Sequence, residues 1–292
     1  MKFWQAVCPA EIDQCCDLAR IAEELGYTGV AMGEHLMTPG RIDSSYPYAK
    51  GGALLWDPTV LFPDPWQMIS IMATATRTLR FMTSIYILPL RDVFSAAKAV
   101  STAAVISDNR VTLGAGSGWM KEEFDIVGQS FHNRGARTGE MLEIIERLMR
   151  GGMVEYHGKH YDFPVVQMSP VPSQPVPVMI GGETDNALRR AAKWNGWISA
   201  PHDQDIDAID AITARLTKLE KIRSESGSSD APFEKLIVTK APPSLDFCRR
   251  LEALGVTMVM PLSWYLQGVA TSTTDNKRKT MEDFAENVIQ KF

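Results

Sequence analysis

The 292-residue chain is poor in cysteine, with only Cys8, Cys15, Cys16 and Cys248, and no two of them form a C-x-x-C pair. Cys15 and Cys16 are adjacent within a helical pattern, so the set has the spacing of neither a disulfide framework nor a zinc site. We therefore expect four reduced and mostly buried thiols, as is usual in the cytoplasm.

Long apolar runs and basic blocks are also absent. No run approaches the roughly 18 apolar residues that a membrane-spanning helix needs. The first residues, MKFWQAVCPAEID, reach Glu11 and Asp13 before an apolar signal-peptide core could form. Both signs of charge are spread along the chain, and the net charge is −5. We expect a cytoplasmic protein with no nucleic-acid partner and no membrane partner.

The composition is that of an ordinary globular protein, with 45% apolar and 22% charged residues. Short apolar runs alternate with helical patterns along the whole chain. Strands are predicted at residues 2–7, 28–32, 79–88, 111–116, 177–180, 196–199, 235–239 and 256–261, and helices at 12–26, 65–76, 92–107, 119–150 with an interruption at 128–133, 183–195, 205–226, 244–254 and 277–292. Strict alternation of eight strands with eight helices implies a parallel sheet that closes into a barrel.

The predicted fold class is therefore α/β, a single (β/α)₈ TIM barrel domain over residues 1–292. An open doubly wound sheet is disfavoured, because the first strand–helix turn has no glycine-rich dinucleotide signature. Two insertions interrupt the barrel: a long loop at residues 33–65 and a hairpin at 155–163 before the fifth strand. The loop contains Tyr46, Tyr48 and Trp56, which are candidate pocket walls or parts of a lid.

The active site of a (β/α)₈ barrel lies at the carboxyl ends of the strands. The second strand ends in Glu34 and His35, a carboxylate and an imidazole that could transfer protons, hold a polar ring edge or form a structural pair. The third strand carries Thr83, Ser84 and Ile85 near its end, and can also be a plain core strand.

Glycines mark the ends of the fourth and fifth strands. Gly114, Gly116 and Gly118 alternate before Trp119, which favours either a flat ligand lying close to the backbone or a tight turn; the G-x-G-x-x-G spacing does not fit. Gly181 and Gly182 precede Thr184 at a helix start. Backbone N–H groups and the helix dipole favour an anion there, with the Thr184 hydroxyl contributing and the intervening carboxylate of residue 183 turned away.

Some polar clusters have less specific patterns. His157 and His160 lie in the predicted hairpin without a third ligand nearby, so we expect no metal site. Arg134 and Arg137 precede a helix, and are either surface charges or groups that reach an anion.

The chain resembles the luciferase-like flavin-dependent oxidoreductases, the bacterial luciferase-like monooxygenase superfamily, and most closely their coenzyme F420-dependent branch. The segments that carry the resemblance are GYTGVAMGEH, LRFMTSIYILPLRDVFSAAKAVSTAAVISDNR, VTLGAGSGWMKEEFDIVG and VPVMIGGETDNALRRAAKWNGWI, within residues 26–198. The resemblance implies a (β/α)₈ barrel, usually a homodimer, with a flavin or deazaflavin ring in the barrel mouth.

The resemblance also implies roles for particular residues. Glu34, where the family often has Asp, and His35 would border the ring, and Thr83–Ile85 would form a bulge behind it, in many relatives with a cis non-proline peptide. The other implied cofactor contacts are Gly114, Gly116, Gly118 and Trp119 for the ring, and Gly181, Gly182 and Thr184 for its phosphate. Some relatives have a catalytic glutamate where this chain has Gly118-Trp119, so that role is not transferred; Glu122 and Glu123 fit as partners of the helix dipole.

The leading functional hypothesis is hydride transfer between coenzyme F420 and a small organic substrate, with His35 as proton donor or acceptor. An alternative is an FMN-dependent two-component monooxygenase, which would need a partner flavin reductase. The third is a non-catalytic flavin-binding barrel.

Overall fold

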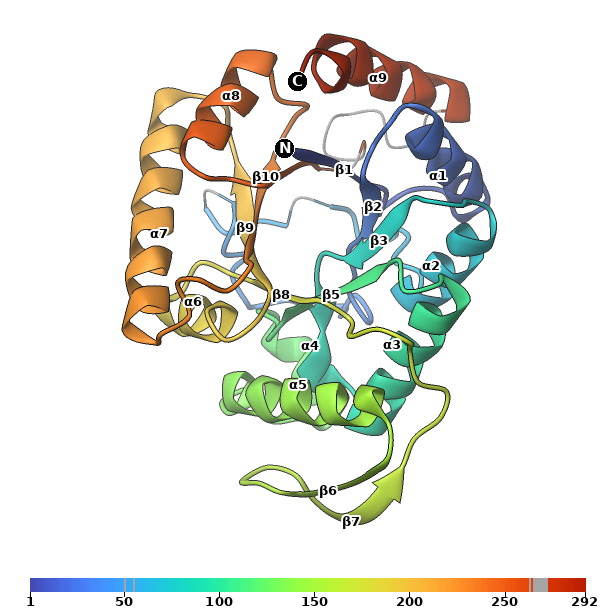
Figure 1. Cartoon of the computed structure of the whole chain (residues 1–292), viewed down its shortest axis with the longest axis vertical. Coiled ribbons are helices and arrows are strands. Elements are labelled where there is room, and N and C mark those ends of the chain that lie inside the picture. The colour runs from blue at the N-terminus through green and yellow to red at the C-terminus, as the bar shows by residue number, and fades with distance from the viewer. Residues whose placement is uncertain (50, 55, 263, 265–272) are drawn as a thin grey trace.

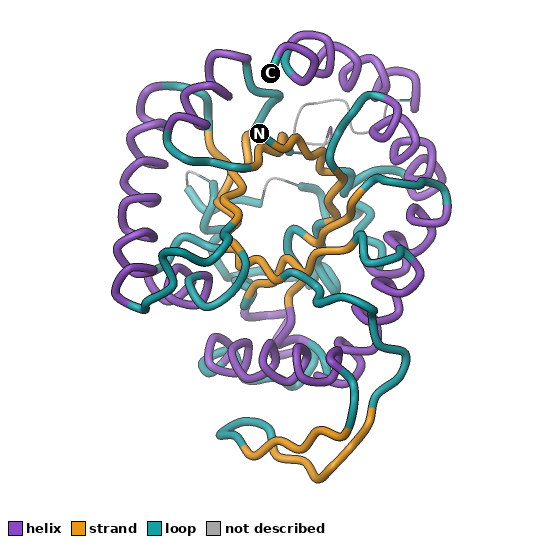
Figure 2. The backbone as a smooth tube through the Cα atoms, in the orientation of Figure 1, coloured by secondary structure: helices purple, strands orange, loops and turns teal. Residues whose placement is uncertain are grey.

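A closed parallel barrel forms the centre of the computed structural model, which describes residues 1–49, 51–54, 56–262, 264 and 273–292. The barrel strands are β1 (Lys2–Ala6), β2 (Gly29–Met32), β3 (Arg80–Thr83), β4 (Tyr86–Ile87), β5 (Val111–Gly116), β8 (Val178–Gly181), β9 (Gly196–His202), β10 (Glu234–Thr239) and β11 (Met258–Pro261). They pair in the order β3-β2-β1-β11-β10-β9-β8-β5-β4, and a β3–β5 pairing closes the ring that Figure 2 shows in orange. The predicted TIM barrel is thereby confirmed.

Helices surround the ring on its outer side (Figure 1). They are α1 (Cys15–Glu24), α2 (Pro65–Thr74), α3 (Val93–Ile106), α4 (Lys121–Ile126), α5 (Arg134–Arg150), α6 (Asp185–Ala191), α7 (Ile206–Glu225), α8 (Leu245–Ala253) and α9 (Thr274–Asn287), with short 3₁₀ turns at Ile12–Gln14, Leu88–Leu90 and Ile289–Lys291. Polar side chains accept a first-turn N–H at several starts, among them Asp92 for α3 and Ser244 for α8. None of the described helices combines the length and apolar character required to cross a bilayer.

Two apolar clusters hold these layers together. The larger one lies between the strands and the surrounding helices, and the smaller one includes Trp4, Met82, Met179 and Met258 from four strands of the ring. Gly29 is needed beside Trp4, because a Cβ atom there would lie 2.5 Å from the indole ring. The thiols of Cys8, Cys15 and Cys248 are buried, as predicted.

The predicted third strand, residues 79–88, is broken into β3 and β4. Phe81 pairs with Val111, an offset of 30 residues, whereas Tyr86 pairs with Ala115, an offset of 29. One extra residue is therefore accommodated between the two strands, as in a β-bulge. The peptide bond between Ser84 and Ile85, within this bulge, is cis.

Other element bounds differ from the prediction. The hairpin is longer than residues 155–163: β6 (Met153–His157) and β7 (Asp162–Gln167) pair antiparallel and project past α5 at the bottom of Figure 1. The helix predicted at 183–195 is only the seven-residue α6. The single domain over residues 1–292 stays a prediction.

Candidate functional site

A cavity of about 1890 Å³ opens at the carboxyl ends of the barrel strands. Of the predicted site residues, those that line it are Glu34, His35, Ser84, Ile85, Gly118, Trp119, Gly181, Gly182 and Thr184. Nine of the twelve predicted site residues therefore lie at this cavity, where the strand-end rule expects them. The volume exceeds the roughly 300–1,000 Å³ of an ordinary small-molecule site, so it leaves room for a large ligand.

Thr83, Gly114 and Gly116 are not among the residues that line this cavity, and their role as cofactor contacts stays a prediction. A Cβ atom on Gly114 would lie 1.8 Å from the Thr83 carbonyl oxygen, and one on Gly116 would lie 1.7 Å from Cδ1 of Ile85. The Thr83 hydroxyl, fully buried, donates to the Gly114 carbonyl oxygen at 2.8 Å. The two glycines thus make room for the chain's own bulge.

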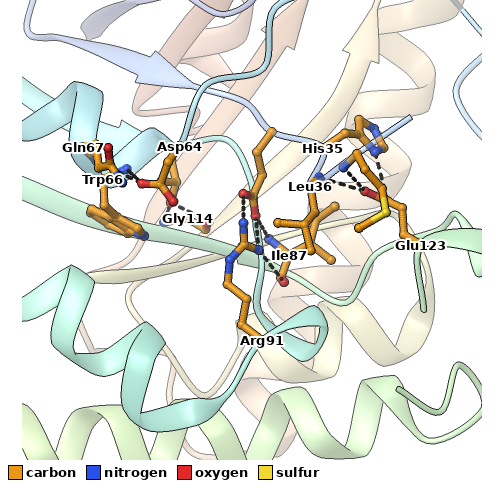
Figure 3. Close-up of polar contacts among 12 residues, drawn as sticks. His35, Leu36, Asp64, Trp66, Gln67, Ile87, Arg91, Gly114 and Glu123 are labelled. Atoms are coloured by element: carbon orange, nitrogen blue, oxygen red, sulfur yellow. Dashed lines mark hydrogen bonds and ion pairs between the residues drawn. The ribbon is translucent and has the colours of Figure 1, made fainter. Parts of the chain in front are cut away.

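His35 is held by a glutamate from a distant part of the chain. Its Nδ1 lies 3.0 Å from Oε2 of Glu123, and the Leu36 N–H donates to Oε1 of the same carboxylate at 2.8 Å (Figure 3). Glu123 is fully buried. As a hydrogen-bond acceptor, the Glu123 carboxylate favours the tautomer of His35 that carries its proton on Nδ1, in which Nε2 can accept a hydrogen bond from a ligand.

The position of Glu122 and Glu123 in the first turn of α4 agrees with their interpretation as helix-dipole partners, and their carboxylates also make specific contacts. Besides the Glu123 contacts, a carboxylate oxygen of Glu122 accepts the backbone N–H groups of Asp43 and Ser44 at 2.8 and 2.9 Å. Both glutamates attach the long loop to α4. Only their position just after the glycine-rich turn hinted at this role.

Glu34 faces away from its neighbour in sequence. Its carboxylate accepts the Ile87 N–H at 2.6 Å and both terminal nitrogens of Arg91, at 3.0 and 2.5 Å (Figure 3). Burial raises the pKa of Glu34 to about 7, although Arg91 and the Ile87 N–H oppose that change. Glu34 and His35 therefore do not act as a pair, because Glu34 contacts Arg91 and His35 contacts Glu123. Glu34 anchors the segment that follows the bulge, and its catalytic role stays a prediction.

Aromatic side chains surround His35 on the cavity side. We call Tyr46, Tyr48, Trp56, Phe62 and Trp119 the aromatic cage; all of them line the cavity. The imidazole ring centre lies 4.9 Å from that of Trp56, 5.4 Å from Phe62 and 5.8 Å from Trp119. The long loop therefore supplies pocket walls, as the sequence indicated.

Two arginines lie at another part of the cavity. Arg134 donates to the carbonyl oxygens of Gly118 and Phe131, and Arg190 donates to that of Gly135, all within 2.9–3.0 Å. In the described part of the chain neither guanidinium contacts a carboxylate. Burial, followed by the charge of Arg134, lowers the pKa of Arg190. A partly buried pair of like charges without counter-ions is a site for an anion.

Arg137 has a different role from Arg134. It is buried, and its guanidinium donates to side-chain oxygens of Asn133 and Gln129 and to the Ser130 carbonyl oxygen. These bonds hold the turn that begins α5. The alternative left open by the sequence is therefore resolved separately for each arginine: Arg134 faces the cavity and Arg137 is structural.

The segment after β8 matches its prediction in part. The Glu183 carboxylate turns to the Ala200 N–H at 2.7 Å and to Arg215 at 3.0 Å, as expected. The Thr184 hydroxyl accepts the Ala187 N–H and caps α6. Within the described residues this hydroxyl donates to no acceptor, and phosphate binding by Gly181, Gly182 and Thr184 stays a prediction.

The hairpin histidines lie outside this cavity. His157 Nδ1 pairs with Asp162 at 2.6 Å on the exposed hairpin. Among the residues that the structure describes, no group of three or more His, Cys, Asp or Glu side chains could hold a metal ion.

A barrel with a large, partly aromatic and partly basic cavity at its strand ends has the architecture of a cofactor-dependent enzyme. Residues 4–239 match the family model of the luciferase-like monooxygenases, and the chain belongs to this family. Members of this family are oxidoreductases.

Similar proteins differ in what is known of them. An uncharacterized protein of Mycobacterium tuberculosis is 34% identical over 296 residues, covering 100% of both chains. The coenzyme F420-dependent tetrahydromethanopterin reductase of Methanopyrus kandleri superposes with a TM-score of 0.76 at 15% identity, covering 100% of this chain and 99% of that one. Monooxygenase RslO1 of Streptomyces bottropensis gives 0.77 at 17% identity, covering 99% of each chain. At these identities the two structures show a shared fold.

Proposed function

We propose that the protein transfers a hydride between coenzyme F420 and a small organic substrate. The observation that carries this proposal is one continuous cavity that joins a carboxylate-held imidazole to two arginines without counter-ions. The first group suits proton exchange with a substrate, and the second suits the anionic part of a cofactor.

The residues present fit such a cofactor. Ser84, Ile85 and Gly118 line the cavity beneath the barrel mouth and would border the ring. Arg134 and Arg190, with the backbone at Gly182, would bind its phosphate. When bound, a deazaflavin supplies a hydride donor or acceptor at C5.

The distribution of cations favours F420 over FMN. Arg189 and Lys193 line the same cavity as Arg134 and Arg190, together with the carboxylates of Glu143 and Glu146. FMN ends in a single phosphate, whereas F420 continues from its phosphate into a chain of glutamyl carboxylates. Four cations match the longer anion better. That the reductase of Methanopyrus kandleri is described as F420-dependent agrees with this choice.

His35 is the proposed proton donor or acceptor. Glu123 keeps the proton of the free imidazole on Nδ1, so Nε2 can accept a hydroxyl proton from a bound alcohol. In the reverse direction the imidazolium returns that proton to a carbonyl oxygen, while Glu123 stabilises the positive charge. The aromatic cage excludes water around the reacting group.

An FMN-dependent monooxygenase is the second candidate, because RslO1, which has the same fold, is described as a monooxygenase. That reading would require a flavin reductase as partner. The cytoplasmic location and the homodimer stay predictions for both candidate functions.

The deciding experiment is equilibrium binding of F420 and of FMN to one preparation, followed by fluorescence. We expect F420 to bind in the micromolar range or tighter, and FMN at least about tenfold more weakly. The reverse order, with oxygen uptake in the presence of reduced FMN, would contradict the proposal and establish the monooxygenase. Tight binding without turnover on any donor or acceptor would favour the non-catalytic barrel.

A further inference from the structure

We infer that the aromatic cage around His35 binds an uncharged, flat molecule with a hydrogen-bonding oxygen: an aromatic alcohol or the corresponding carbonyl compound. This inference names the substrate class and rests on the proposed function for its catalytic meaning. The binding itself can be measured without cofactor or turnover.

The walls of the cage are rings with uncovered surface. Tyr46, Tyr48, Trp56, Phe62 and Trp119 are each only half-buried, and all of them line the cavity. Tyr46 contacts Trp56 and Trp119 edge to face, with centres 5.1 and 5.2 Å apart. An aromatic ligand gains both area burial and further edge-to-face contacts among such rings.

The described carboxylates beside the cage already have partners within the chain. Glu123 is occupied by His35 and by the backbone N–H groups that follow it, and Glu122 by those of Asp43 and Ser44. Glu34 is paired with Arg91. Arg134 and Arg190, which lack a carboxylate partner among the described residues, line the same cavity and are assigned to the cofactor by the proposed function. A charged ligand in the cage would lose hydration without gaining an ion pair.

The imidazole of His35 offers a polar contact at Nε2, and the indole N–H of Trp56, which is buried without a hydrogen-bond partner among the described residues, offers a second. Because Glu123 holds Nδ1, the imidazole side chain, 9% exposed, presents Nε2 as its free atom between the rings. A hydroxyl group can donate to this nitrogen, and a carbonyl oxygen can accept from it when the ring is protonated. Apolar walls around this contact select a neutral ligand that places its oxygen there.

The test compares three ligands of one shape, benzyl alcohol, benzoate and benzylammonium, by calorimetry on the full chain with and without F420. We expect benzyl alcohol to bind at least about tenfold more tightly than either ion. Equal or tighter binding of benzoate would overturn the inference. So would tighter binding of benzylammonium, which would show a cation–π site instead.

Variants locate the binding. Trp56→Leu removes a ring, and should weaken benzyl alcohol binding by about tenfold, whereas Trp56→Phe keeps a ring and should stay within about threefold. Phe94→Leu, at an exposed ring near the hairpin, is the matched control and should change nothing. Unchanged affinity in Trp56→Leu would contradict the inference. If Trp56→Leu fails to fold, the affinity of Trp56→Phe and the comparison of the three ligands still test the inference.

The two proposals fail separately. Selective benzyl alcohol binding without any F420 binding would leave the cage inference standing and remove the proposed function. F420 binding without this selectivity would leave the proposed function standing and remove the cage inference.

Discussion

Arginines at the two ends of the barrel differ in what they face: at both ends they donate to backbone carbonyl oxygens, but Arg134 and Arg190 at the carboxyl ends also line the cavity. At the amino ends of the strands, the Glu23 carboxylate accepts the N–H groups of Thr78 and Leu79 at 2.6 and 2.8 Å, and Arg110 donates to the carbonyl oxygens of Leu79 and Ala73 at 2.8 and 2.7 Å. At the carboxyl ends, Arg134 and Arg190 share a cavity without a carboxylate partner in the described residues.

This difference separates stability from function. Charges that are satisfied by the chain's own backbone tie loops to strands, and their loss leaves orphaned polar groups. Charges that face a cavity without partners reduce stability and remain available to a ligand. Substitution of a charged residue should therefore lower the stability of the fold at the amino ends of the strands, and lower ligand binding at the carboxyl ends.

The largest expected effect is at the carboxyl end. His35→Ala should lower the turnover of an F420-linked substrate by about 10²- to 10⁴-fold, because a positioned proton donor or acceptor is removed. The midpoint of thermal unfolding should change little. Steady-state kinetics measures the turnover, and a thermal melt of the same preparation measures the unfolding midpoint. Unchanged turnover would show that His35 is not the proton donor or acceptor.

Arg110→Ala should give the largest loss of stability, about 2–4 kcal/mol in the free energy of unfolding, because several carbonyl oxygens lose their donor. F420 affinity should be unchanged. Urea denaturation measures the first quantity and fluorescence titration the second. The exposed neighbour Arg77, replaced by Ala, serves as control and should change stability by no more than about 0.5 kcal/mol. A large loss of F420 binding in Arg110→Ala would show that the amino end also affects the cofactor site, and would contradict this prediction.

Arg190→Gln should weaken F420 binding by about 10- to 100-fold and should not destabilise the fold, since one of two like charges is removed. The loss should shrink at high salt, because salt already screens the charge of the wild type. Arg250→Gln, at an exposed surface pair on α8, is the control with the same change of charge. Equal F420 affinity in both variants would rule out the arginine pair as the cofactor's anion site.

Glu23 predicts a pH-dependent stability at the amino end. Burial opposes ionisation, but the backbone N–H groups of Thr78, Leu79 and Arg77 dominate and lower the pKa of Glu23 from 4.5 to about 2. A lowered pKa stabilises the fold above pH 4.5, and this contribution is lost as the pH falls toward 2. Glu23→Gln should therefore cost about 1–2 kcal/mol at pH 7, with the difference from wild type closing in acid. Urea unfolding at pH 7, 4 and 2.5 checks this, and a pH-independent difference would contradict it.

The smallest expected effect is a gain. Gly139 lies in α5 with no atom within 4 Å of an added Cβ, so Gly139→Ala should stabilise the protein by about 0.5–1 kcal/mol. Gly114→Ala is its counterpart and should destabilise, because its Cβ would meet the Thr83 carbonyl oxygen. Thermal melts of both variants compare them, and a stable Gly114→Ala would show that the bulge can move.

The barrel fold, and the end of the barrel at which the site lies, can be predicted from the sequence alone. Apolar runs alternating with helical patterns dictate a parallel closed sheet, local residues such as Asp92 and Ser244 mark helix starts, and residues at strand ends gather at one mouth. These features depend on neighbours in sequence, so they can be read from the chain.

Only the tertiary structure decided which side chains meet. Glu123 reaches His35 across 88 positions, and Glu34 reaches Arg91 across 57. The space beside Gly114 is filled by the chain's own Thr83, although a ligand would have explained the glycine equally well. Such pairings depend on strand register and on the orientation of elements far apart in sequence, which no local pattern encodes.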